Sequence, residues 1–264
     1  MVIAFIVLIL ICIFLFLIFP SLRRHPDRQV LSGLKIAHRG YHDNNKTVPE
    51  NSLLSARLAM EKGYAIENDI HLTADGEVVV FHDDTLDRVC GVNGLIEEKT
   101  LAQLKELRLA GTKEQIPTLK EFLDTVDGTV PLLIEIKCSG PACYEICKKT
   151  SEILKSYKGK YFVQSFYPPA LGWFKKHRPD VLRGQLSCEF PKDAFYKKLL
   201  SALLYNFISR PDFVSYKIED SKNIFRKLVT FFGAMPVGWV FRSDKQVQEY
   251  GKHYETYIFE YFDI

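Results

Sequence analysis

Five short motifs along the chain combine histidine, carboxylate and basic side chains with apolar, strand-like runs. They are Ile36-Ala-His-Arg-Gly40, Pro49-Glu50-Asn51-Ser52, Glu67-Asn-Asp69, Phe81-His82-Asp83 and Ile134-Glu-Ile-Lys137. Each motif occurs by chance in many chains, but five of them in a fixed order with strand context form a strong signal. Brought together, residues of these types are suited to metal-assisted cleavage of a phosphodiester.

The acidic members of the set predict a metal site. Glu67 and Asp69 alternate with Asn68 along a predicted strand, so both carboxylates point to the same face. Glu135 stands at the end of the next principal strand. Three converging carboxylates repel one another unless a hard cation lies among them, and oxygen ligands favour one divalent cation, Mg²⁺ or Ca²⁺. The alternative is three separate ion pairs, which are common for a lone acid but unexpected for three acids at strand ends.

The histidines and cations complete the predicted chemistry. His38 ends the first predicted strand and His82 ends a later apolar run, so both can act as general acid and base near neutral pH. A lone histidine at a strand end is more often structural, and it is the acidic neighbours that favour catalysis here. Arg39 and Lys137 are suited to hold phosphate oxygens, and Arg39 can do so in a bidentate manner.

Apolar strand-like runs alternate with amphipathic stretches, which is typical of repeated βα units and a parallel sheet. Eight principal strands are predicted over residues 34–38, 65–71, 132–136, 161–164, 181–186, 213–216, 236–241 and 256–262. Eight such units predict an α/β fold, a TIM (β/α)8 barrel with its chemistry at the carboxyl ends of the strands. A further run at 77–82 follows the turn Asp75-Gly76, so we expect it to pair antiparallel with the second strand. Residues 83–115 then form a small insertion with a helix near 100–109.

Residues 2–19 are apolar without interruption, and as a helix they would cover about 27 Å, close to the thickness of a bilayer core. We therefore expect a single-pass transmembrane anchor at 1–20, a linker at 21–33 and a barrel at 34–264. A cleaved signal peptide is the alternative, but the run lacks a basic segment before it and a small-residue cleavage site after it.

The charged residues around this segment bear on location. Arg23, Arg24 and Arg28 follow it while no Lys or Arg precedes it, which favours a cell-membrane protein with its barrel on the cytoplasmic face. Five cysteines outside the segment show no disulfide spacing, so free thiols in a reducing compartment are expected. The net charge of +3 is small and scattered, so no nucleic-acid partner is expected. Nothing in the sequence indicates an oligomeric state.

On these motifs, residues 36–262 resemble the glycerophosphodiester phosphodiesterases, which are divalent-metal-dependent TIM barrels. The resemblance implies that His38 and His82 are the acid and base, that Glu67, Asp69 and Glu135 hold the metal, that Arg39 and Lys137 bind phosphate, and that Glu50 and Asn51 support them. It also implies a small-molecule glycerophosphodiester as substrate, cleaved to glycerol 3-phosphate and an alcohol. In that family the substrate's own glycerol hydroxyl attacks, and water then opens the cyclic phosphate.

Two segments depart from the family pattern. Where the family often has Trp-Thr-Val-Asn, this chain has Trp239-Val-Phe-Arg242, which keeps the supporting aromatic wall but changes the polar contact. The last strand ends Phe259-Glu-Tyr-Phe-Asp263 without the usual Asp-Gly. Two alternatives stay open: a phosphatidylinositol phospholipase C-like or phospholipase D-like barrel acting on intact lipid, and a catalytically silent, membrane-tethered binding barrel. Loss of a motif residue would favour silence, and none is lost.

Overall fold

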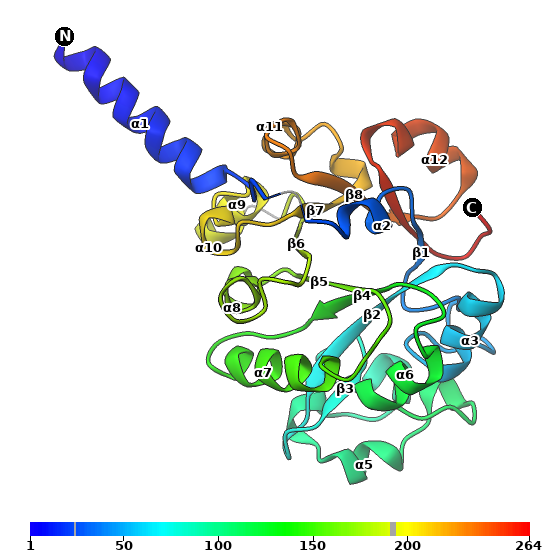
Figure 1. The fold of residues 1–264 in the computed structure, drawn as a ribbon. Helices are drawn as coiled ribbons and strands as arrows, with labels where there is room; N and C mark the ends of the chain where they lie inside the picture. The colour runs from blue at the N-terminus through cyan, green and yellow to red at the C-terminus, as the bar shows by residue number, and fades with distance from the viewer. Residues whose placement is uncertain (24, 191–193) are drawn as a thin grey trace.

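A closed barrel of eight parallel strands forms the centre of the protein (Figure 1). The structure is a computed structural model that describes residues 1–23, 25–190 and 194–264. The barrel strands are β1 (Lys35–Ala37), β2 (Ala65–Leu72), β4 (Leu132–Ile136), β5 (Tyr161–Ser165), β6 (Arg183–Ser187), β7 (Phe213–Lys217), β8 (Met235–Phe241) and β9 (Thr256–Phe259). The barrel closes because β1 pairs in parallel with both β2 and β9. The predicted TIM barrel is confirmed.

The interior of the barrel changes from apolar to polar along the strands. Near their amino ends the strands contribute a fully buried apolar cluster that includes Ile36, Ala65, Leu133, Phe162 and Ile258. Because side chains on one face of a strand recur every second residue, the next inward positions lie toward the carboxyl ends. Those positions hold His38, Glu67, Glu135, Gln164 and Glu260. The inward-facing positions of the strands therefore form an apolar layer near the amino ends and, toward the carboxyl ends, a polar layer that contains candidate site residues.

Helices cover the outside of the barrel. They are α3 (Leu53–Glu61), α6 (Leu119–Val126), α7 (Ala142–Leu154), α8 (Pro168–His177), α9 (Phe195–Ser201), α10 (Asn206–Ser209), α11 (Ile224–Phe231) and α12 (Asp244–Tyr250). A capping box of Thr118 and Glu121 starts α6, and Ser52 with Ser55 forms another at the start of α3. Helices α9 and α10 are not one continuous helix, because Leu203 between them has left-handed backbone (φ 56°).

The insertion after the second strand forms a small satellite beside the barrel. Strand β3 (Val78–Val80) pairs antiparallel with β2, as predicted, with Ile70 opposite Val80. Short helices α4 (Asp87–Cys90) and α5 (Leu101–Lys105) follow, so the helix expected near 100–109 is shorter than the sequence suggests. Phe81, Leu86, Ile96 and Leu104 give the satellite a buried core of its own.

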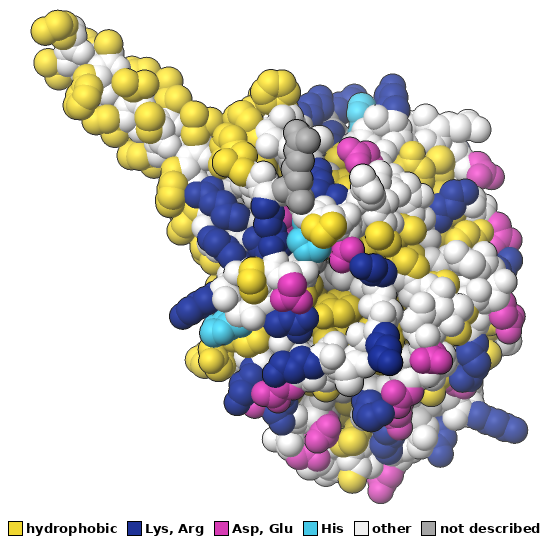
Figure 2. Space-filling view, in the orientation of Figure 1, with side chains coloured by type: hydrophobic (Ala, Val, Ile, Leu, Met, Phe, Trp, Pro, Cys, Tyr) yellow, Lys and Arg dark blue, Asp and Glu magenta, His cyan; other side chains and the backbone are white. Residues whose placement is uncertain are grey.

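The amino-terminal helix α1 (Val2–Ile18) projects from the barrel, and apolar side chains cover its surface (Figures 1 and 2). The predicted bilayer-spanning helix is not confirmed: among the described residues, no helix has both the length and the apolar character to cross a membrane. The helix stops at Ile18 because Phe19 takes an extended conformation before Pro20.

The segment between α1 and the barrel packs against the barrel. Asn206 donates a hydrogen bond of 2.9 Å to the carbonyl of Ile18, and Arg23 forms an ion pair of 3.0 Å with Asp212. Helix α2 (Arg28–Leu31) inserts Leu31 into the apolar layer at the amino ends of the strands. Residue 24, one of the arginines considered for orientation, lies outside the described residues.

The expectation of free thiols at all five cysteines outside the amino-terminal segment is wrong. Cys138 and Cys143 form a disulfide, because the loop after β4 turns at Gly140 (φ 61°) and brings their Cα atoms to 5.0 Å. His25, His42 and His71, which lie outside the five motifs, are buried. The backbone carbonyls of Asp180 and His82 contact His25 and His71 respectively, so packing of neighbouring segments accounts for the burial of these two.

Candidate active site

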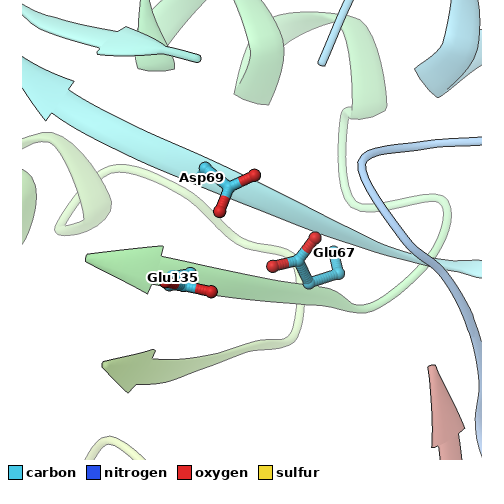
Figure 3. A group of neighbouring side chains, drawn as sticks. All are labelled: Glu67, Asp69 and Glu135. Atoms are coloured by element: carbon cyan, nitrogen blue, oxygen red, sulfur yellow. The ribbon is translucent and has the colours of Figure 1, made fainter. Parts of the chain in front are cut away.

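Three buried carboxylates form the centre of the site (Figure 3). Glu67 and Asp69 lie on β2, and the parallel register places Asp69 directly beside Glu135 of β4. One oxygen from each of the three lies within 4.8 Å of the others. All three residues are at most 6% exposed, so water screens little of their mutual repulsion.

The protonation of these acids reflects that repulsion. Burial, followed by the charges of Asp69 and Glu135, raises the pKa of Glu67 well above its ordinary value. Burial opposes ionisation of Asp69 too, but the positive charges of Lys137, His82 and Arg39 lower its pKa. A donor set of three carboxylates without sulfur fits a hard divalent cation, which would also offset the repulsion. These residues therefore fit the predicted metal site.

His38 is held by two residues from the far end of the chain. Its Nδ1 lies 2.5 Å from Oε2 of Glu260, and Arg242 donates from Nε to Oε1 of the same carboxylate at 2.6 Å. Burial and then the charge of Arg39 lower the pKa of His38 to about 4, while Glu260 offsets part of this shift. His38 is therefore neutral at neutral pH. Because its Nδ1 proton is donated to Glu260, Nε2 is the nitrogen that can accept a proton.

His82, which follows β3, has a similar arrangement. Its Nδ1 lies 2.6 Å from Oδ1 of Asp83, and Arg88 donates from Nε to Oδ2 of Asp83 at 2.7 Å. The His82 side chain is 30% exposed, compared with 13% for His38. The charge of His82 helps to lower the pKa of Asp69, and the charge of Asp69 offsets part of the lowering of the pKa of His38. Both histidines therefore lie beside the carboxylate cluster.

The predicted phosphate-binding cations lie against the acids. Lys137 Nζ is 2.6 Å from Oε1 of Glu135 and 3.1 Å from Oδ1 of Asp69. Burial would lower the pKa of Lys137, but Asp69 and Glu135 raise it above its ordinary value, so the ammonium stays charged. Arg39 forms an ion pair of 2.8 Å with Glu50, and its backbone N–H donates to Glu67 at 3.1 Å.

Glu50 and Asn51 position other residues. Glu50 accepts hydrogen bonds from both terminal nitrogens of Arg88, each at 2.7 Å, as well as from Arg39. Asn51 donates to Oδ2 of Asp69 at 2.9 Å and reaches back through its own N–H to the carbonyl of Arg39. Arg39 and Asn51 both have left-handed backbone, with φ of 58° and 54°, which locates backbone strain at the site.

Two further features shape the mouth. Trp239 donates from its indole nitrogen to the carbonyl of Ser215 at 3.2 Å and contacts Phe166 edge to face at 5.7 Å, so an aromatic wall is present. A Cβ on Gly40 would lie 2.3 Å from Oγ of Ser55, so only glycine lets the His38 loop approach α3 this closely. The structure thus brings all ten predicted site residues to the barrel mouth.

Sequence reasoning missed four residues that hold the histidines: Glu260, Arg242, Asp83 and Arg88. Asp83 lies in the Phe81-His82-Asp83 motif, so the acid that directly follows His82 was a usable signal. Glu260 and Arg242 lie in the two segments that depart from the family pattern. Glu260 directly follows the last barrel strand, and an acid at that place was a usable signal of a site residue. No feature of the sequence indicated a role for Arg88.

Comparison with known proteins identifies the family. The sequence profile of the glycerophosphoryl diester phosphodiesterase family matches residues 38–215. The chain belongs to this family. It is 38% identical over 165 residues to a glycerophosphodiester phosphodiesterase of Caldanaerobacter subterraneus, covering 58% of this chain and 66% of the relative. It is 30% identical over 156 residues to one from Bacillus altitudinis, covering 55% and 62%. The chain thus spans less than two thirds of either relative.

Solved structures agree with this assignment. A phosphodiesterase of Oleispira antarctica, solved with its product sn-glycerol-3-phosphate, superposes with a TM-score of 0.72 at 25% identity, covering 88% of this chain and 94% of that one. A glycerophosphodiester phosphodiesterase of Parabacteroides distasonis superposes with a TM-score of 0.70 at 24% identity, covering 87% and 93%. The second likeness supports the fold alone.

Proposed function

We propose that the protein is a metal-dependent phosphoric diester hydrolase that cleaves glycerophosphodiesters to glycerol 3-phosphate and an alcohol. The observation that carries this proposal is the cluster of Glu67, Asp69 and Glu135 bordered by two histidines that are each held by a carboxylate. A metal site alone would suit many reactions. Two oriented imidazoles beside it suit a reaction in which one oxygen loses a proton and another gains one.

The two histidines divide the proton transfers. His38, neutral because burial lowers its pKa to about 4, accepts through Nε2 the proton of the substrate's glycerol hydroxyl as that oxygen attacks phosphorus. His82 donates a proton to the departing alcohol oxygen. Water then opens the cyclic phosphate with the roles reversed. The cation, Mg²⁺ or Ca²⁺ in our proposal, would be held by the three carboxylates and would stabilise charge on the phosphate oxygens. Arg39 and Lys137 add positive charge to the same oxygens.

The test is release of glycerol 3-phosphate from a panel of glycerophosphodiesters, with intact diacyl phospholipids alongside. We expect release from the glycerophosphodiesters only, because a diacyl lipid lacks the free hydroxyl that attacks. The Glu67→Gln variant should be inactive in the same assay, since it replaces one proposed metal ligand by an uncharged side chain of nearly equal size. Cleavage of the diacyl lipids would instead support the phospholipase alternatives, and a complete lack of cleavage would support the silent binding barrel.

We also propose that α1 holds the protein at the cell membrane, with the barrel on the cytoplasmic face. The exposed apolar side chains along α1 support insertion into lipid, and Arg23 and Arg28 after the helix favour the cytoplasmic side. The cysteines no longer support that side, because a disulfide is more typical of an oxidising compartment. Protease treatment of intact protoplasts should leave the barrel whole, and digestion without lysis would place it outside.

A further inference from the structure

A pocket of about 620 Å³ lies where α1 meets the barrel, and none of the candidate site residues lines it. The end of α1 and the residues after it contribute apolar side chains, among them Leu15, Phe16 and Phe19. The barrel contributes three cations: Lys175, Arg183 and Arg210. Figure 2 shows Lys and Arg side chains gathered beside the end of the apolar helix. The pocket therefore combines positive charge with apolar surface.

The positive charge of the pocket exceeds what the nearby acid neutralises. Buried Asp212 forms an ion pair of 3.0 Å with Arg23 and one of 3.7 Å with Arg183, so one carboxylate is shared by two cations. Among the described residues, no Asp or Glu lines the pocket itself. Burial, followed by the charges of Arg210 and Arg183, lowers the pKa of Lys175. The three cations therefore repel one another, and a bound anion would offset that repulsion.

The two arginines of the pocket keep unused hydrogen-bond donors. Arg183 donates from Nε to the carbonyl of Ser209 at 2.8 Å and from Nη2 to the carbonyl of Arg210 at 3.1 Å. Its buried Nη1 donates no hydrogen bond within the described part of the chain. Arg210 donates from Nη1 to the carbonyls of Phe16 and Phe19, both at 2.8 Å, and among the described residues no acceptor contacts its Nε or Nη2. Guanidinium donors of this kind are suited to the oxygens of a phosphate group.

The apolar side of the pocket is held in place and continues away from the barrel. Phe16 lies under the guanidinium of Arg210, with 4.8 Å between the guanidinium carbon and the ring centroid, and its ring is 5.8 Å from that of Phe207. Exposed apolar side chains extend from Phe16 along the rest of α1. A ligand with a phosphate and a long apolar chain would match both parts, whereas a small soluble anion would leave the apolar side without a contact.

We propose that this pocket binds the phosphate of an anionic phospholipid, whose acyl chains lie along the exposed apolar surface of α1. The lipid is a bound ligand here and not a substrate, because the pocket contains none of the residues assigned to the reaction. A zwitterionic phospholipid is disfavoured, since its headgroup cation would add to the positive charge of the pocket. The placement of the acyl chains rests on the proposed insertion of α1 into lipid, and the phosphate site is independent of the proposed hydrolysis.

The test measures the affinity of the full-length protein for phosphatidylglycerol and phosphatidylcholine with the same labelled acyl chains, in a nonionic detergent at low salt. A chelator prevents turnover. We expect phosphatidylglycerol to bind about 25-fold more tightly, because Lys175 and Arg210 should each contribute roughly fivefold, the usual effect of one cation near an anionic lipid.

The variants remove these contributions one at a time. Lys175 is exposed and donates only to the carbonyl of Ile208, so Lys175→Gln should fold normally and reduce the preference to about fivefold. Adding Arg210→Gln should abolish the preference. The matched control is Lys176→Gln, which removes the next lysine of α8, exposed and outside the pocket, and should keep the wild-type preference. An unchanged preference in Lys175→Gln, or an equal loss in Lys176→Gln, would overturn the site.

Two further measurements identify the source of the phosphate and separate the hypotheses. Inorganic phosphate, titrated by calorimetry, should bind far more weakly than phosphatidylglycerol, and equal affinity would assign the pocket to a free anion and overturn the lipid. Flotation with vesicles of pure phosphatidylcholine tests the insertion of α1 separately. Flotation combined with no preference for phosphatidylglycerol would overturn the phosphate site alone. A lack of flotation would overturn the insertion of α1, whereas a preference that depends on Lys175 would still support the phosphate site.

Discussion

A carboxylate and an arginine hold each of the two histidines, but the two arrangements draw on different parts of the sequence. On one side, His38 of the first strand meets Glu260, which lies 222 residues later, and Arg242 holds that carboxylate. On the other side, His82, Asp83 and Arg88 lie within one short segment of the insertion. The first arrangement exists only when β1 closes the barrel against β9, whereas the second forms locally.

This difference in construction matches a difference in environment. Barrel closure buries His38, lowers its pKa to about 4 and leaves it a neutral proton acceptor. The insertion leaves His82 closer to solvent, where a leaving alcohol can depart. In our proposal the buried His38 is the base and the more exposed His82 is the acid, and the following experiments test this division.

The largest effect should come from removing either imidazole. His38→Ala and His82→Ala should each lower kcat on glycerophosphocholine by about 10² to 10⁴-fold, the usual worth of general acid or base catalysis. A nitrophenyl ester of glycerol phosphate separates the roles, because its leaving group needs no proton. His82→Ala should regain most of its activity on that ester and His38→Ala should not. The reverse pattern would exchange the two assignments.

The next effect concerns Glu260. Glu260→Gln should lower kcat/KM by roughly 10 to 100-fold, since a hydrogen bond to a charged group contributes about 1.5–3 kcal/mol. Glu260 raises the pKa of His38, so its loss should lower that pKa further. The acid limb of the pH profile of kcat/KM, which reports protonation of His38, should then move to lower pH. Asp83→Asn is the control that should leave this limb in place, and an unmoved or raised limb in Glu260→Gln would contradict the positioning role.

The smallest effect is expected at the outer arginines, where the two sides should differ. Arg242 is 47% exposed and contacts only Glu260 through its side chain among the described ion pairs, so Arg242→Gln should lower kcat/KM by at most about fivefold. Arg88→Gln should lower kcat/KM by a larger factor and should also raise KM, because Arg88 holds Glu50, the partner of Arg39. Steady-state kinetics of the two variants compare these losses, and equal losses would argue against a role for Arg88 beyond Asp83.

The same contrast explains what the sequence could predict. Side chains alternate between the two faces of a strand, and a sequence displays this period of two directly. The barrel strands could therefore be predicted, and so could the convergence of Glu67, Asp69 and Glu135 on adjacent parallel strands. The Glu260 and Arg242 support for His38 depends on which strand ends meet after closure, and a single sequence does not display that contact. The disulfide needed the turn at Gly140, and the length of α1 depended on the backbone at Phe19. Tertiary geometry decided each of these points.

The most direct measurement is the metal dependence of glycerol 3-phosphate release. Exhaustive chelation should abolish release from glycerophosphocholine, and added Mg²⁺ or Ca²⁺ should restore it. Asp69→Asn should need a much higher cation concentration, while its circular dichroism should match that of the wild type because Asp69 lies at the barrel mouth and not in the apolar layer. Full activity after exhaustive chelation would contradict the role assigned to Glu67, Asp69 and Glu135.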